Sequence, residues 1–103
     1  MKKTLLLLSI SSLLACTRLL IPNQSDADRA AKQFPGITLA DITKGKTLHE
    51  QHCGKCHGLK NPSSRNEGAW KKILPEMANK AKIDAETQEA ILKYILSMHN
   101  AKR

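Results

Sequence analysis

Cys53-Gly54-Lys55-Cys56-His57 follows the pattern C-x-x-C-H, which is the attachment signature of a c-type haem. The two cysteines lie about one helical turn apart, so both thiols can reach vinyl groups on one edge of a porphyrin. His57 is then placed to supply the proximal nitrogen ligand of the iron. The motif therefore predicts one covalent haem c, held by Cys53, Cys56 and His57.

Three other interpretations of the two cysteines remain open with weaker support. A thioredoxin-type redox motif needs a βαβ context, and no run of this sequence alternates as a strand does. A zinc site needs a second pair of ligands at suitable spacing, which only His49 and His52 offer, in a cramped cluster. A structural disulfide leaves His57 without a role.

Residues 1–15 have the layout of a secretory signal, with a basic start, an apolar run too short to span a membrane and small residues at the end. Leu13-Leu14-Ala15-Cys16 resembles the lipobox of bacterial lipoproteins, in which the signal is cut before the cysteine and that cysteine is acylated. An ordinary secretory signal is the alternative. We therefore expect an exported chain, anchored by lipid on Cys16 at the periplasmic side of a bacterial membrane. Thr17, in place of an aspartate, favours the outer membrane.

The segment 16–39 is predicted to be a lipidated cysteine followed by a flexible tether. Residues 23–28 are polar, and Pro22 and Pro35-Gly36 interrupt the segment. Leu19-Leu20-Ile21 is a short apolar patch that either contacts the lipid interface or is an unremarkable spacer. The folded domain is then expected over residues 40–103.

Residues 41–97 resemble a class I cytochrome c domain. The stretch 44–53 is similar to the N-terminal helix of that family, and Gly45 takes the place of its glycine at the crossing with the C-terminal helix, where a side chain would not fit. Residues 85–98 are similar to the C-terminal helix, with Tyr94 as the aromatic at the crossing. The resemblance implies an all-α fold in which the N- and C-terminal helices cross around one covalent haem.

The pattern of residues 85–98 predicts a helix independently of that resemblance. Asp84 is a favourable N-cap, and an apolar stripe recurs at helical spacing. The stripe consists of Ile91, Tyr94, Ile95 and Met98.

The resemblance implies a distal methionine ligand from the segment before the last helix, and Met77 fits by chain order and by the spacing Trp70-x6-Met77. A thioether ligand favours ferrous iron and raises the potential relative to two histidines. The alternatives are that Met77 is only a core residue, that Met98 or a histidine is the ligand, or that the position is open. We expect His49 and His99 at the surface, and His52 too close to the attachment motif to reach across the ring.

Two prolines bear on this site. Pro75 lacks an amide donor, so we expect one helical turn to end there and another to begin. Pro62 resembles the proline of the family whose carbonyl accepts the N–H of the proximal imidazole, which would orient the ring. Its alternative role is that of a turn residue in Asn61-Pro62-Ser63-Ser64.

The charge of the chain, 17 basic against 9 acidic residues, suits an acidic partner. Lysines in the segment that surrounds the haem in this family would steer an acidic redox protein, although such residues often only keep a surface soluble. Nucleic acid is a poor partner for an exported haem chain. The lysines concerned are Lys55, Lys60, Lys71, Lys72, Lys80 and Lys82.

The expected function is one-electron transfer by a haem cycling between Fe(II) and Fe(III), with no catalysis of a substrate reaction. The alternative is a gas-binding or sensing module whose distal ligand is absent or displaceable. Trp70 and Tyr94 are the only aromatic residues of segment 40–103, and so small a domain usually needs a crosslink or a cofactor to be stable. We therefore expect the haem to complete the core.

Overall fold

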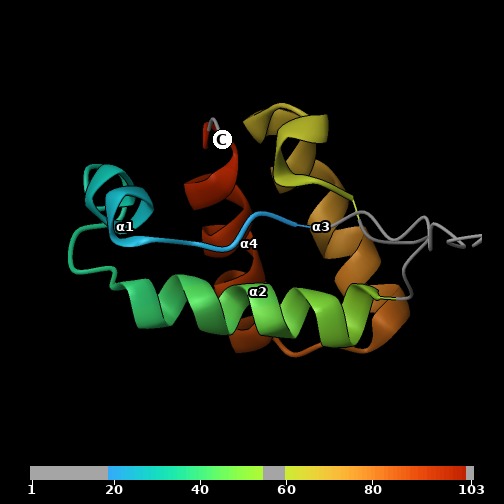
Figure 1. The fold of residues 1–103 in the computed structure, drawn as a ribbon. Coiled ribbons are helices and arrows are strands. Elements are labelled where there is room, and N and C mark those ends of the chain that lie inside the picture. The colour runs from blue at the N-terminus through green and yellow to red at the C-terminus, as the bar shows by residue number, and fades with distance from the viewer. Residues whose placement is uncertain (1–18, 55–59, 102–103) are drawn as a thin grey trace, which may run out of the picture.

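The computed structural model describes residues 19–54 and 60–101. Within these ranges it contains only helices: α1 (Gln24–Ala30), α2 (Leu39–Cys53), the 3-10 turn η1 (Pro62–Ser64), α3 (Glu67–Ala81) and α4 (Ala85–Met98) (Figure 1). The prediction of an all-α fold is confirmed for this part of the chain. None of these helices has the length and apolarity needed to cross a membrane.

Helix α4 packs against every other element and forms the centre of the molecule. It begins after Asp84, whose carboxylate accepts a hydrogen bond from the amide of Thr87 at 2.7 Å, as the sequence predicted. The predicted bounds of 85–98 are confirmed, and the whole predicted apolar stripe is buried. The other large core side chains are Ile42, Trp70 and Leu74.

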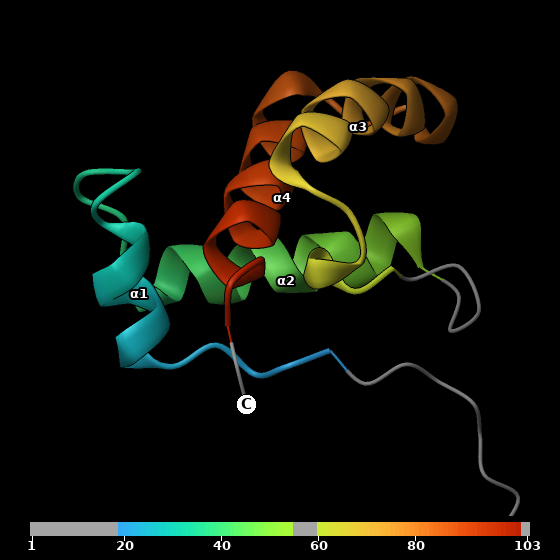
Figure 2. The same cartoon turned by 90° about the horizontal axis from the view of Figure 1, so that it is seen from above.

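Helix α2 crosses α4 at Gly45 (Figure 2). A Cβ atom at this position would lie 2.5 Å from the carbonyl oxygen of Ala90 and 2.6 Å from Cβ of Tyr94. Real side chains do not come this close, so the helices can approach only because the residue is glycine. The predicted close approach of Gly45 to Tyr94 is confirmed.

Helix α3 runs through Pro75 without a break, so the prediction that a helical turn ends there is wrong. Pro75 has no amide hydrogen, so the carbonyl of Lys71 lacks the hydrogen bond that residue 75 would otherwise donate to it. Both Pro75 and Lys71 are exposed. Water can reach this face of the helix. The opposite face buries Trp70, Leu74 and Ala78 and so holds the two halves of α3 against the core.

The described part of the expected tether, residues 19–39, is not flexible chain but a packed segment. Leu19 and Pro22 are buried, and α1 buries Ala27 and Ala30 against its neighbours α2 and α4. The polar residues that suggested a linker instead form a capping box, in which Asn23 and Asp26 bond each other's backbone amides. The flexible-tether prediction is wrong for these residues.

Candidate haem-binding site

The C-terminal end of α2 and the C-terminal half of α3 enclose a shallow hollow of about 320 Å³ with a mainly apolar lining. Cys53 is the last residue of α2, and Met77 lies on α3. Both line this hollow, together with His52, Lys80 and Ala81. The structure therefore brings together two of the residues that the sequence predicted to hold a haem. Cys56 and His57, like Cys16, lie outside the described residues.

Cys53 carries a free, half-buried thiol, and burial raises its pKa. A reactive redox cysteine has a lowered pKa, because a nearby positive charge or a helix N-terminus stabilises its thiolate. Cys53 instead stands at the C-terminal end of its helix, where a thiolate is disfavoured. Its surroundings suit an uncharged sulfur, such as that of a thioether, better than a thioredoxin-type thiolate.

Met77 is only partly buried and lies beside the core stripe of α3 rather than within it. Its thioether is therefore available at the hollow, unlike that of Met98, which is 3% exposed and belongs to the core cluster. This difference favours Met77 over Met98 as a ligand. Of the three histidines that lie within residues 19–54 and 60–101, His52 is the one that lines the hollow with Met77.

His49 was expected at the surface, but the structure buries it to 1% exposure. Its ring lies against that of Tyr94, with the centroids 5.7 Å apart. Neither ring nitrogen, nor the hydroxyl of Tyr94, has a hydrogen-bond partner in the described part of the chain. Burial lowers the pKa of His49, and the nearby backbone of Lys60 and the carboxylate of Glu50 oppose this shift only in part.

The position of His49 follows from helical spacing. It lies four residues after Gly45 and four before Cys53, so it shares the face of α2 that meets α4. The helical spacing of Ile42, Gly45 and His49 in the sequence already indicates that the three residues share one buried face. The prediction missed His49 because histidine is a polar residue. His49 is not among the residues that line the hollow.

His99 was also expected at the surface and is instead partly buried. Its Nε2 lies 2.7 Å from the carbonyl oxygen of Arg65, so the ring joins the end of α4 to the chain just after η1. This hydrogen bond holds the imidazole ring of His99 at Arg65, and His99 does not line the hollow. It does not favour His99 as an iron ligand.

Pro62 opens η1 and is buried, and its carbonyl accepts a hydrogen bond of 2.8 Å from the indole nitrogen of Trp70. Trp70 is fully buried, and the guanidinium of Arg65 lies over its ring at 5.5 Å. The hydrogen bond ties the segment after the attachment motif to α3, the helix that carries Met77. A carbonyl oxygen has two lone pairs, so the predicted bond from His57 to Pro62 stays a prediction.

The described lysines of the predicted docking surface are exposed. Lys80 lines the hollow, and Lys71 is 3.9 Å from Glu67, a distance at which an exposed ion pair contributes little. Their positive charge therefore remains available to an approaching acidic surface. The set comprises Lys60, Lys71, Lys72, Lys80 and Lys82, while Lys55 lies outside the described residues.

The donor set of the hollow is compatible with a haem. Among residues 19–54 and 60–101, no three histidine, cysteine or acidic side chains are grouped as metal ligands. A thiol and a thioether around an apolar hollow match a flat apolar ring that is bonded at its edge and ligated from one face. No protein-family model, curated protein or solved structure matches this chain.

Proposed function

We propose that this chain is an electron carrier with one haem c, exported and held at a membrane by lipid on Cys16. The observation that carries the proposal is that Cys53 of the C-x-x-C-H motif and Met77 line the same apolar hollow. Cys53 and Cys56 would hold the ring, and His57 and Met77 would be its axial ligands. The bound group supplies reversible one-electron exchange between Fe(II) and Fe(III).

The residues of the chain keep the surroundings of the ring rigid. Cys53 ends a helix that is fixed to α4 at Gly45, and Met77 sits on a helix that is fixed by the bond between Trp70 and Pro62. Groups held on packed helices move little when the charge of a nearby centre changes. A small rearrangement on electron exchange is what a carrier needs.

The partner supported by the charge of the chain is a redox protein with an acidic docking surface. Exposed lysines on α3 and at the rim of the hollow would steer such a partner to the haem edge. Because this steering acts through solvent, the rate of association should fall as salt is added.

The optical spectrum of the haem-loaded protein tests the proposal. We expect the oxidised protein to show the far-red band of an iron–thioether bond, and Met77→Ala to abolish it. Met98→Leu is the matched control, because Met98 is a buried core residue that does not line the hollow. A high-spin spectrum with rapid binding of carbon monoxide to the unaltered protein would instead support the gas-binding function.

A further inference from the structure

The structure describes the chain from Leu19 on, and Leu19 follows Cys16, the proposed site of lipid attachment, by three residues in the sequence. Leu19 is 9% exposed and Pro22 is buried, whereas the side chain of Ile21 between them is 78% exposed. Among the described residues, Ile21 is the one large hydrophobic side chain that is exposed. The domain thus presents an apolar side chain to solvent two residues after Leu19, where the described chain begins.

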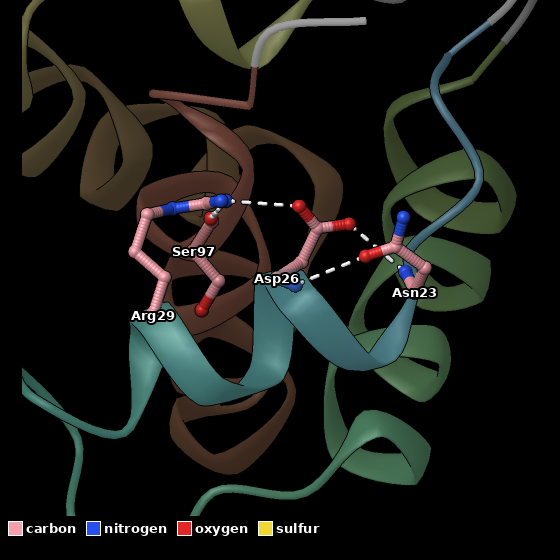
Figure 3. A network of polar contacts seen from close by, with 4 residues as sticks. All are labelled: Asn23, Asp26, Arg29 and Ser97. Atoms are coloured by element: carbon pink, nitrogen blue, oxygen red, sulfur yellow. Dashed lines mark hydrogen bonds and ion pairs between the residues drawn. The ribbon is translucent and has the colours of Figure 1, made fainter.

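The segment is held in place by polar contacts as well as by packing (Figure 3). Arg29 of α1 donates a hydrogen bond of 2.8 Å to the carbonyl oxygen of Ser97 in α4 and lies 3.0 Å from the carboxylate of Asp26. Asp26 is fully buried and caps α1 together with Asn23. A helix of seven residues is not stable alone in water, so α1 exists because it is docked on α4.

Chain length then limits how far the domain can lie from its anchor. Three residues span at most about 10 Å, so Leu19 stays within that distance of Cys16. A flexible chain over residues 16–39 would instead give an average reach of about 25 Å and free rotation. Because residues 19–39 are docked, the reach is limited to the three residues from Cys16 to Leu19.

We propose that the face of the domain that carries Ile21 lies on the bilayer surface when Cys16 is lipidated. This inference rests on the lipid anchor of the proposed function, and its partner is the lipid surface itself. The side chains of Asn23, Gln24 and Ser25, which follow Ile21 closely in the chain, are exposed and uncharged. Burial of an apolar side chain favours the contact, and the short connection enforces it.

The proposed contact gives the domain one orientation. In Figure 2 the segment around Ile21 lies on one side of α2, and α3 lies on the other. The membrane contact therefore turns α3, with Met77 and its exposed lysines, toward the aqueous phase. A redox partner would reach the hollow from that side without displacing the domain from the membrane.

Site-directed spin labelling of the lipidated, haem-loaded protein in liposomes tests the orientation. A nitroxide is attached to Ile21→Cys and, as the matched control, to Lys72→Cys on the exposed face of α3. We expect the label at position 21 to collide with lipid-soluble oxygen and to be shielded from a water-soluble nickel complex. The label at position 72 should show the reverse.

A second variant tests the role of chain length, with a flexible Gly-Ser linker of about ten residues inserted between Arg18 and Leu19. The label at position 21 should then become accessible to the nickel complex. Water accessibility at position 21 without the linker would overturn the proposal, as would lipid contact that persists with it. The mass of the N-terminal peptide reports acylation of Cys16, and a missing acyl mass would also overturn the inference. The haem spectrum decides the electron-carrier function separately.

Discussion

Gly45 sets how closely the crossing helices α2 and α4 can approach. Gly45→Ala places a methyl group against the backbone of Ala90 and against Tyr94, neither of which can move without shifting α4. We expect it to lower the free energy of unfolding by about 1–3 kcal/mol in chemical denaturation. Gly68→Ala is the control, because a Cβ there meets only Asn66 Oδ1 at an ordinary 3.5 Å. Equal effects of the two substitutions would contradict the assigned close approach.

His49 should make the stability of the protein depend on pH. Burial lowers its pKa below the ordinary value of 6.5, so the unfolded chain binds a proton more readily than the folded one. The free energy of unfolding should therefore fall as the pH drops below about 6.5, until the folded protein also becomes protonated.

Chemical denaturation at several values between about pH 5 and pH 7 measures this effect. His49→Gln removes the titrating group and should flatten the pH dependence in this range. The pH dependence that remains in His49→Gln belongs to the other titrating groups. The capping bonds of Asp41 and Asp84 lower the pKa of these two carboxyls from 3.8, so both protonate below the pH range of this experiment.

At the level of single residues, the sequence predicted what residue type and spacing determine together. Gly45, Tyr94 and Asp84 were predicted correctly because each has a physical role that few other residues can fill. His49 was not, since a histidine is usually solvated and only tertiary packing shows that its face of α2 is covered.

At the level of elements, α1 depends on Arg29. Arg29→Ala removes the bond to Ser97 and one charged partner of the buried Asp26. We expect α1 to detach and the free energy of unfolding to fall by about 1–3 kcal/mol, less than for a fully buried pair because Arg29 is partly exposed. Hydrogen exchange should show the amides of α1 losing protection while those of α4 keep it.

The matched control is Lys71→Ala, which removes an exposed pair with Glu67 at 3.9 Å. Its effect on stability should be about 0.5 kcal/mol or less. If the amides of α1 remained protected in Arg29→Ala, apolar packing alone would hold the segment.

The sequence predicts a helix well when the helix has a recognisable capping residue and a continuous apolar face. Helix α4 has both a capping aspartate and an unbroken stripe, and its bounds were predicted correctly. Helix α1 has seven mostly polar residues, of which only Asp26, Ala27 and Ala30 are buried, and its Arg29 finds a partner on α4. The prediction that a helical turn ends at Pro75 was wrong because a helix can include an exposed proline when its other face is well packed.

At the level of the whole molecule, the haem is expected to complete a small core. Trp70 and Tyr94 are the aromatic residues of segment 40–103, and Cys53 would be bonded to the ring. We expect Cys53→Ala/Cys56→Ala to give a largely unfolded apoprotein, because a domain of this size rarely folds on its apolar core alone. Circular dichroism during heating measures this. A cooperative transition in the variant would show that the helices hold together without the crosslink.

The order of the elements along the chain has a consequence for how the protein is made. Helix α4 packs against each of the other elements, and it is the last of them to be synthesised. Until residues near Met98 are available, α1, α2 and α3 lack their main packing surface, so the growing chain stays open. Under the proposed function, a chain that folds late would pass through a secretion channel unfolded, and the thiols of Cys53 and Cys56 would stay reachable for haem attachment until α4 is complete.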